Sequence, residues 1–337
     1  MPNYAPSPPK ARRRARGLNA PPRAAITRRQ RGNTPRPPQG RDVVHDPSKC
    51  PALPDLRPRL AKREGAHKYH HGHAVVLAGG PGRGGAGRLA ARAALRVGAG
   101  LVTLACPPEA LAENAARLDA IMLRPLADAI ALAALLEDDR ITALCLGPGL
   151  GLGAATRDLA LTALAADQAT VLDADALTVF AADPEALFDR ARANGRAVLT
   201  PHGGEFARLF PDLACRMAEE PMDSPAFSKV DATRAAAARA GAVVLFKGPD
   251  TVIAAPDGQL VLDPHHRERG APWLATAGSG DVLAGLIAGL AARGFAPFEA
   301  AQIGTILHVE AARRFGPGLI AEDLPEQIPA VFRDLGL

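Results

Sequence analysis

The chain has 337 residues, of which 47% are hydrophobic but only 4% aromatic. Its core therefore has to be built from Ala, Val, Leu and Ile, as in parallel sheets covered by helices. Arg, Asp or Gly interrupts every apolar run before it reaches the roughly 18 residues that span a bilayer, so we expect a soluble, cytoplasmic protein without a membrane segment.

The formal net charge of +5 belongs to the N-terminal end of the chain. Residues 1–41 carry eleven Lys or Arg, nine prolines and no acid, whereas the remainder holds 29 basic and 35 acidic residues. We expect residues 1–45 to be a disordered basic tail and residues 46–65 a linker. The tail is interpreted as a spacer or as the product of a start codon placed too far upstream. A nucleic-acid arm, a membrane arm or a transit peptide shares its composition, although its prolines disfavour the helix of a transit peptide.

The cysteines favour a reducing compartment. All four are widely scattered and form no C-x-x-C pair with metal-ligand spacing; they are Cys50, Cys106, Cys145 and Cys215. Cys106 and Cys145 lie in apolar, strand-like runs, so we expect buried free thiols in the cytoplasm.

From residue 74 onward, short β-type runs alternate with Ala-rich helical runs. Strands are predicted at 74–78, 101–105, 143–146, 170–173, 197–200 and 242–246, with crossover helices such as 88–97 and 231–240. Residues 251–255 and 260–262 flank a Pro-Asp-Gly turn and predict a hairpin. The alternation predicts one α/β domain over residues 66–335. We expect an open, mostly parallel sheet with helices on both faces, in which the loops after the strands carry the chemistry.

Two glycine-rich loops follow predicted strands. The loop at 79–87 precedes a helix and contains a G-x-G-x-x-G match that begins at Gly82, with Glu109 after the next strand, so a Rossmann dinucleotide site is one interpretation. Its glycines are dense enough for a match by chance. The loop at 147–151 either lets a ligand approach the backbone or is only a tight turn. Neither loop ends in Gly-Lys-Ser/Thr, which excludes a standard P-loop.

Two further motifs lie at strand ends. His202-Gly-Gly-Glu205 follows the strand at 197–200. A lone His is commonly structural or solvated, but this position favours a site, and Glu205 could hold Mg²⁺ through water. Lys247 follows the strand at 242–246 and either neutralises a phosphate as a point charge or is an ordinary surface lysine.

The tetrad Gly278-Ser279-Gly280-Asp281 opens an apolar run at 282–290, whose spacing predicts a helix with one buried face. Free N–H groups and the helix dipole at such a turn favour an anion. Asp281 could take a proton there, or it could be an ordinary first-turn acid. Together these features predict phosphoryl chemistry.

In order and spacing, these motifs resemble one family. With His67-Lys68 and the segment Leu172-Asp-Ala-Asp-Ala-Leu177, they are similar to the ADP-dependent NAD(P)H-hydrate dehydratases, which have a ribokinase-like fold. The resemblance covers about residues 60–332. It implies a hydro-lyase that returns the S form of hydrated NADH or NADPH (NADHX, NADPHX) to NADH or NADPH while ADP becomes AMP and phosphate, with Mg²⁺ assisting. It also implies a homo-oligomer, for example a tetramer, with no nucleic-acid or membrane partner.

The resemblance also assigns site residues. It implies that Asp281 is the base that takes the hydroxyl proton, and that the N–H groups of Gly278, Ser279 and Gly280 stabilise the moving phosphoryl group. Its AMP-contacting positions are Lys247, Gly248, Pro249, Asp250, Thr251 and Gly280. Its hydrated-cofactor positions are Ala86, Gly149, His202 and Asp281, and Glu205 is its Mg²⁺-supporting acid. The alignment within the glycine loop could place Ala86 one residue away.

The chain departs from the family pattern at Tyr69, where Gly is common, and at Ser279, where Thr is common; neither change removes a needed group. Many bacterial members carry an N-terminal epimerase domain, and with about 60 residues before the match we expect no epimerisation. The nearest alternative is a ribokinase-like, ATP-dependent kinase of a vitamin-precursor alcohol. A Rossmann NAD(P)-dependent dehydrogenase and a nucleic-acid-binding protein acting through its tail are the others.

Overall fold

The computed structural model describes residues 53–219, 226–262 and 270–337. The predicted basic tail and Cys50 lie outside these residues. Within them, strands form one nine-stranded sheet in the order β3-β2-β1-β4-β5-β6-β7-β8-β9. The strands are β1 (His73–Leu77), β2 (Leu101–Cys106), β3 (Met122–Pro125), β4 (Ala143–Leu146), β5 (Ala169–Leu172), β6 (Ala197–Leu199), β7 (Val243–Phe246), β8 (Val252–Ala254) and β9 (Leu260–Leu262).

The sheet is mostly parallel, as predicted. Strands β1 to β7 pair in parallel, with Val75 of β1 opposite Thr103 of β2 and Leu144 of β4. The pairs β7–β8 and β8–β9 are antiparallel, which confirms the hairpin. Each of the six other predicted strands is confirmed to within one residue at either end. Edge strand β3 was not predicted, because Arg124 and Pro125 interrupt its apolar pattern.

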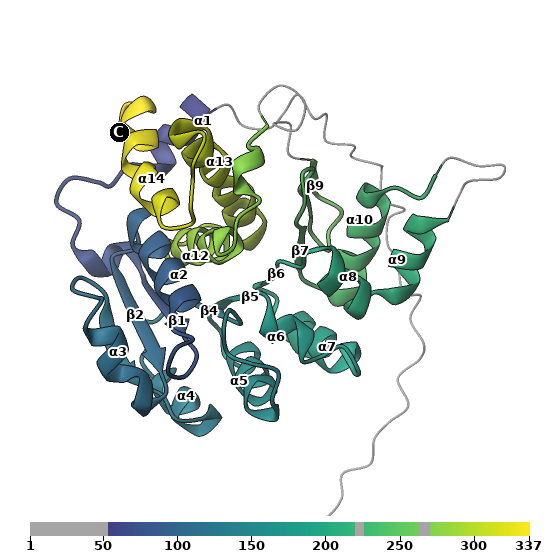
Figure 1. Ribbon diagram of the computed structural model, residues 1–337, viewed down its shortest axis with the longest axis horizontal. Coiled ribbons are helices and arrows are strands. Elements are labelled where there is room, and N and C mark those ends of the chain that lie inside the picture. Colours follow the sequence, from purple (N-terminus) through teal and green to yellow (C-terminus); the bar gives the residue numbers. More distant parts are fainter. Residues whose placement is uncertain (1–52, 220–225, 263–269) are drawn as a thin grey trace, which may run out of the picture. The chain divides into compact units, whose positions relative to one another are not determined.

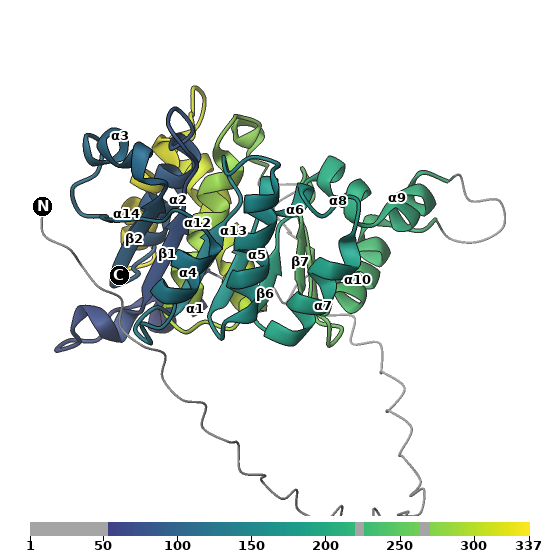
Figure 2. The same ribbon diagram turned by 90° about the horizontal axis from the view of Figure 1, so that it is seen from below.

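Helices cover both faces of the sheet (Figures 1 and 2). One face carries α1 (Leu53–Leu60), α2 (Gly85–Arg96), α12 (Ser279–Ala292), α13 (Pro297–Phe315) and α14 (Asp323–Asp334). The other carries α4 (Ala129–Leu135), α5 (Ala154–Ala165), α6 (Asp175–Thr178), α7 (Pro184–Asn194), α8 (Gly203–Leu209), α9 (Pro211–Ala218) and α10 (Lys229–Ala240). The remaining helical turns are α3 (Leu111–Ala115), η2 (Lys68–His71), η3 (Pro108–Ala110) and η4 (Pro272–Leu274).

The two cores follow from the side-chain alternation of the strands. In β1, Ala74 and Val76 face one core, whereas Val75 and Leu77 face the other. Because both faces are covered, all five residues of the strand are buried and its sequence is continuously apolar. Cys106 and Cys145 are buried free thiols, as predicted. None of the described helices combines the length and apolarity needed to cross a membrane.

Helix α12 corrects one prediction. The sequence spacing indicated one buried face, but every residue from Val282 to Ala292 is buried. The helix packs between the sheet and the helices α2 and α13. A Cβ at Gly285 would lie 2.1 Å from the carbonyl oxygen of Ala90 in α2, so glycine is what permits this close approach. The helix is apolar all round because it has neighbours all round.

The domain also begins earlier than the predicted linker implies. Residues 53–60 form α1, and the side chains of Leu56 and Leu60 are buried in the same core as α2 and α12. Arg293 at the end of α12 donates a hydrogen bond of 2.6 Å to the carbonyl oxygen of Leu60. This helix is therefore part of the packed domain.

Candidate active site

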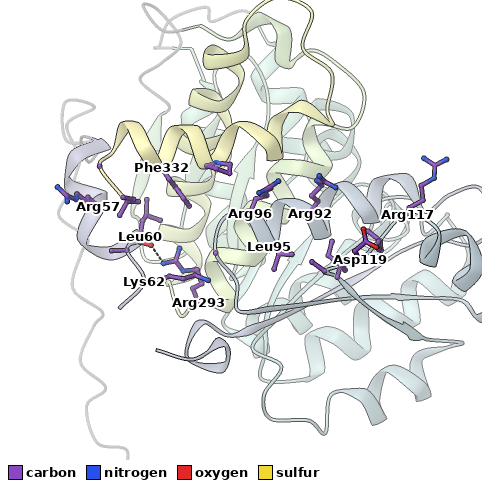
Figure 3. Close-up of a pocket in the computed structure, with 18 residues that line it drawn as sticks. Arg57, Leu60, Lys62, Arg92, Leu95, Arg96, Arg117, Asp119, Arg293 and Phe332 are labelled. Atoms are coloured by element: carbon purple, nitrogen blue, oxygen red, sulfur yellow. Dashed lines mark hydrogen bonds between the residues drawn. The ribbon is translucent and has the colours of Figure 1, made fainter. Parts of the chain in front are cut away.

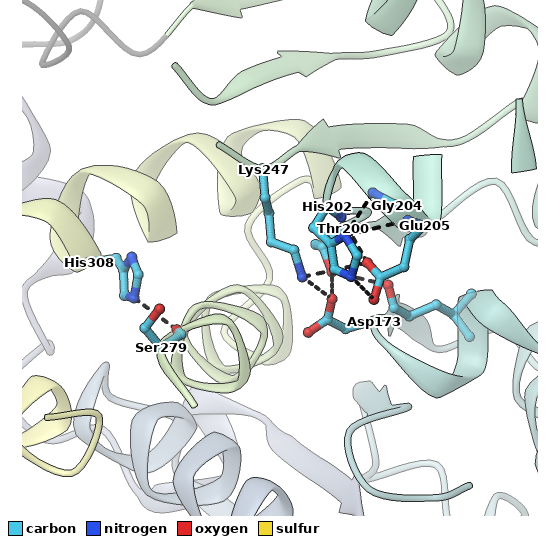
Figure 4. A network of polar contacts seen from close by, with 9 residues as sticks. Asp173, Thr200, His202, Gly204, Glu205, Lys247, Ser279 and His308 are labelled. Atoms are coloured by element: carbon cyan, nitrogen blue, oxygen red, sulfur yellow. Dashed lines mark hydrogen bonds and ion pairs between the residues drawn. The ribbon is translucent and has the colours of Figure 1, made fainter. Parts of the chain in front are cut away.

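The carboxyl ends of three neighbouring strands bring polar side chains to one edge of the sheet (Figure 4). Asp173 follows β5, Thr200 follows β6 and Lys247 follows β7. The ammonium of Lys247 donates to Oδ1 of Asp173 at 2.5 Å, and the hydroxyl of Thr200 donates to the same oxygen at 2.9 Å. The Asp173 side chain is only 2% exposed, so its charge is compensated inside the protein.

Helix α12 points its N-terminus at this ion pair. A Cβ built on Gly280 would lie 3.5 Å from Nζ of Lys247 and 3.9 Å from Oδ2 of Asp173. Gly278, the N-cap residue, has a positive φ of 87° that suits glycine. The tetrad and Lys247, separate in the sequence, thus form one site in which free helix N–H groups lie beside a cation. This is an arrangement suited to phosphate.

The tetrad is held from behind by a second buried helix. Nε2 of His308, on α13, donates to the carbonyl oxygen of Ser279 at 2.9 Å (Figure 4). The Ser279 hydroxyl donates to the carbonyl oxygen of Leu274 at 2.7 Å. Burial lowers the pKa of His308 to about 4, more than the bond to Ser279 raises it. A neutral imidazole therefore fixes the turn without adding charge to the site.

Asp281 lies in the first turn of α12 and has an altered acidity. Burial, and then the negative charge of Asp173, raise its pKa to about 7, although Lys247 opposes the change. Burial alone would lower the pKa of Lys247, but the surrounding carboxylates raise it above its ordinary value. Near neutral pH the site thus combines a permanent cation with a carboxylate that can exchange a proton, which is what a general base requires.

His202 and Glu205 form a reciprocal cap at the start of α8. Nδ1 of His202 accepts from the backbone N–H of Gly204 at 2.9 Å, while Oε2 of Glu205 accepts from the backbone N–H of His202 at 2.8 Å. Since Nδ1 is an acceptor, a neutral His202 carries its proton on Nε2, which lies 3.3 Å from Oε1 of Glu205. Burial raises the pKa of Glu205, against the effect of Lys247, whose Nζ is 3.9 Å away. The two side chains thus cap α8, and Glu205 also lies near Lys247, whereas their roles in substrate and Mg²⁺ binding stay predictions.

The glycine loops pack against each other and against this edge. A Cβ on Gly79 would lie 2.0 Å from the carbonyl oxygen of Gly149, and one on Gly147 would lie 1.7 Å from that of Asp173. Gly149 itself has a φ of 75°. The first loop ends at Gly85, where α2 begins, so Ala86 lies in the first turn of that helix. Its involvement stays a prediction.

The residue between two site carboxylates has an unusual backbone. Ala174 has φ 49° and ψ −117°, and among the described residues no other non-glycine has a positive φ. Such conformations cost roughly 1–3 kcal/mol. On its far side, Oδ2 of Asp175 accepts from the N–H of Gly151 at 2.7 Å.

Two residues that contribute to the site were not predicted to do so. Asp173 was noted only within a segment of the resemblance, although an acid directly after an apolar strand is a signal for a site residue. Lys229, on α10, donates to the carbonyl oxygen of Asp250 at 2.6 Å and to that of Lys247 at 3.3 Å. It therefore braces the segment from Lys247 to Thr251, and no sequence pattern distinguished it from other helical lysines.

Comparison with known proteins agrees with this geometry. Residues 74–329 match the model of the NAD(P)H-hydrate dehydratase family. The chain is 41% identical over 294 residues to the bifunctional NAD(P)H-hydrate repair enzyme of Moorella thermoacetica, covering 83% of this chain but 53% of that protein. It is 39% identical over 255 residues to the ADP-dependent (S)-NAD(P)H-hydrate dehydratase of Neisseria meningitidis, covering 75% of this chain and 80% of that protein.

A solved structure of an NAD(P)H-hydrate dehydratase has a similar fold. The ADP/ATP-dependent NAD(P)H-hydrate dehydratase of Bacillus subtilis, co-crystallised with ATP and Mg²⁺, superimposes with a TM-score of 0.67 at 26% identity, covering 84% of this chain and 97% of that one. The sheet, its helices and this neighbour define a protein of ribokinase-like fold. The chain belongs to the NAD(P)H-hydrate dehydratase family. It spans about half the length of the bifunctional relatives that it matches. Membership of this family disfavours the alternative of a Rossmann dehydrogenase, while a place for the glycine loop in the site stays a prediction.

Proposed function

We propose that this chain dehydrates the S form of hydrated NADH or NADPH at the expense of ADP, with NADH or NADPH, AMP and phosphate as products. Membership of the family supports the reaction class. The observation that carries the proposal is Asp281, a partly buried carboxylate with a pKa of about 7 in the turn that faces Lys247.

The chemistry explains why a dehydratase would need a phosphoryl donor. Hydroxide is a poor leaving group, so the hydroxyl on nicotinamide C6 first takes the β-phosphoryl group of ADP. Asp281 accepts the hydroxyl proton as the new O–P bond forms, and the bond from phosphorus to the bridging oxygen breaks to release AMP. Phosphate then departs with its C–O bond electrons while the neighbouring carbon loses a proton to water and the ring double bond re-forms. Atoms and charge balance in both steps.

The two halves of the site have different tasks in this proposal. Lys247 and the N–H groups of Gly278, Ser279 and Gly280 stabilise negative charge on the transferring group. The segment of Gly248, Pro249, Asp250 and Thr251 holds the nucleotide, and Lys229 supports that segment from α10. On the other side we place the hydrated nicotinamide against Ala86, Gly149 and His202. The close approach of the loop backbones at Gly79 and Gly149 supports a surface made of main chain there.

Magnesium fits the site as an ion brought by the nucleotide. Among the described residues no group of three or more His, Cys, Asp or Glu could form a cage for a metal. Mg²⁺ in phosphoryl-transfer sites is commonly held by the phosphates, a few waters and one or two carboxylates. Glu205 has lone pairs left after accepting the His202 N–H, so we propose that it accepts from waters of the ion. Bound there, the ion would neutralise phosphate charge.

We also propose that the protein acts in the cytoplasm as a homo-oligomer, on small molecules and without a nucleic-acid partner. The buried free thiols of Cys106 and Cys145 suit a reducing compartment. Sedimentation of the full chain would measure the oligomeric state directly, and a monomer at working concentration would contradict this part of the proposal.

One assay tests the function. Chemically hydrated NADH is supplied with Mg²⁺ and either ADP or ATP, and recovery of absorbance near 340 nm is followed together with AMP release. We expect NADH and AMP from ADP, and a loss of roughly 10²-fold or more for Asp281→Asn, because a positioned base is removed. Asp323→Asn is the matched control, since Asp323 is a first-turn acid of another helix, α14. Full activity of Asp281→Asn, or ATP converted to ADP with a stable phosphorylated alcohol, would refute the proposal.

A further inference from the structure

A cavity of about 810 Å³ lies between α1, α2, α14 and the loop 117–121, at the end of α12 opposite the tetrad (Figure 3). Its lining includes one acid, Asp119, and six cationic side chains, which are Arg57, Lys62, Arg92, Arg96, Arg117 and Arg293. We call this cavity the basic pocket. Its volume is that of a small-molecule site, and its charge indicates an anion.

Among the described residues, four of these six cations have no carboxylate partner, and one of the four, Arg293, is bonded to backbone carbonyl oxygens instead. Arg92 and Arg96 both pair with Glu326 of α14. In the part of the chain that the structure describes, by contrast, no carboxylate lies within 4.0 Å of the charged groups of Arg57, Lys62 or Arg117. A bound anion would supply the missing charge.

The unbalanced charge alters nearby groups. Burial, and then the charge of Arg293, lower the pKa of Lys62. Burial, and then the charges of Lys62 and Arg293, lower the pKa of His71. These like charges repel one another, and the fold nevertheless holds them together.

Arg293 is fixed in this arrangement by the backbone. Its guanidinium donates to the carbonyl oxygens of Val97 at 2.8 Å and Leu60 at 2.6 Å, and burial lowers its pKa. A Cβ at Gly98 would lie 3.0 Å from this guanidinium and 3.4 Å from Cε of Lys62. Glycine at position 98 thus leaves room for the two cations to sit side by side.

The walls between the cations are apolar. Leu95 of α2, Leu118 and Ile121 of the loop, and Phe332 of α14 line the pocket. Figure 3 shows Phe332 between Arg57 and Arg96, with Arg117 farther along the pocket. A ligand that matches this lining has an apolar or planar part and several negative charges distributed along its length.

We propose that the basic pocket binds an organic polyphosphate of the nucleotide type at a site separate from the Asp281 centre. Inorganic phosphate alone would leave the apolar walls uncovered. The chain's own residues 1–41 carry eleven cations and no acid, so their charge opposes occupancy by that segment. The proposal concerns binding and does not depend on the dehydration reaction.

The test uses ADP as the probe and the full-length protein. Calorimetric titration of the wild type is expected to show two ADP sites, the pocket site weakening steeply with added salt. In Lys62→Glu/Arg117→Glu the pocket site should weaken about 10-fold or more, since two attractive charges become repulsive. Both side chains are exposed and lack acidic partners, so the fold should tolerate the change. Arg190→Glu, at an exposed position on α7, is the matched control.

Each result has one meaning. A lower pocket affinity in the double variant, with the affinity of the other ADP site unchanged, supports the proposal even if hydrated NADH is not turned over. ADP binding that the double variant leaves unchanged, whether the wild type has one site or two, overturns it. Dissociation of an oligomer by the double variant without any change in ADP binding would assign the pocket to contacts between copies, and would overturn it as well.

Discussion

The two ends of helix α12 hold charge in contrasting ways. At its N-terminus, three carboxylates surround Lys247, and their effects on one another appear as raised pKa values. At its C-terminus, Arg293 and Lys62 lie together without an acidic partner among the described residues. A site that compensates its own charge can move protons between its groups, whereas a site that leaves charge unbalanced can only attract a partner that brings the opposite sign. The N-terminal end of α12 is therefore suited to proton transfer, and its C-terminal end to binding an anion.

The largest expected effect comes from removing the cation that compensates the buried carboxylate of Asp173. Lys247→Met leaves the buried carboxylate of Asp173 without its cation, and we expect the free energy of unfolding to fall by about 3 kcal/mol. Adding Asp173→Asn should recover most of this loss, because the buried charge that Lys247 compensates at hydrogen-bond distance is then removed as well. Urea denaturation of the single and double variants measures both values. Equal losses in the two variants would show that the pair is not compensating.

The next effect concerns the pH dependence of stability. Asp281 has a folded-state pKa of about 7 against an ordinary value of 3.8, so the folded protein binds the extra proton between these limits. Stability from this group is present at low pH and is lost as the pH rises through 7. Asp281→Asn removes the loss, so we expect it to stabilise the protein by about 2 kcal/mol more at about pH 8 than at about pH 5. Thermal unfolding at both pH values tests this, with Asp323→Asn as the control.

A smaller effect should appear in the rate profile. With Asp281 as base, kcat/KM rises with pH through about 7. The charge of Asp173 raises that pKa, so Asp173→Asn should move the acid limb to lower pH by about one unit. If the limb stays in place while the maximum rate falls, Asp173 acts only through structure.

The smallest effect belongs to the other end of the helix. Lys62→Gln removes a repulsion with Arg293, so we expect a gain of about 0.5 kcal/mol or less, since Lys62 is exposed and screened. The gain should shrink at high salt. Thermal unfolding at low and high salt measures it, and Arg190→Gln should show no such gain. A loss of stability would mean that Lys62 already has a partner.

The strands were predictable because their signal lies in a few consecutive residues. Continuous apolar runs such as Ala143–Leu146 indicated the strands, and parallel pairing then brings their carboxyl ends to one edge. Strand β3 was not predicted, because an edge strand can carry residues such as Arg124 and Pro125 that interrupt the apolar pattern. The burial of α12 on all sides was not predicted, because it depends on α2 and α13, which lie elsewhere in the chain.

The Asp173–Lys247 site and the basic pocket show more clearly that local sequence does not reveal contacts between distant residues. The family resemblance, and not local sequence, placed Lys247 and the tetrad in one site. Nothing in the local sequence of Asp173 or Lys247 indicates the bond between these two residues, which are 74 positions apart. The basic pocket draws on residues from Arg57 to Leu337. A set spread over most of the chain, with no motif at any member, is recognisable only once the fold has assembled it.

The strained residue Ala174 lies between two carboxylates that bond to different parts of the candidate site. Its neighbours reach in different directions, Asp173 to the ammonium of Lys247 and Asp175 to the N–H of Gly151. Because Asp173 and Asp175 flank Ala174, a rotation about its φ or ψ would turn one carboxylate relative to the other and strain these two bonds. The two bonds thus hold Ala174 in its strained conformation, and removing either one leaves this peptide unit freer to relax.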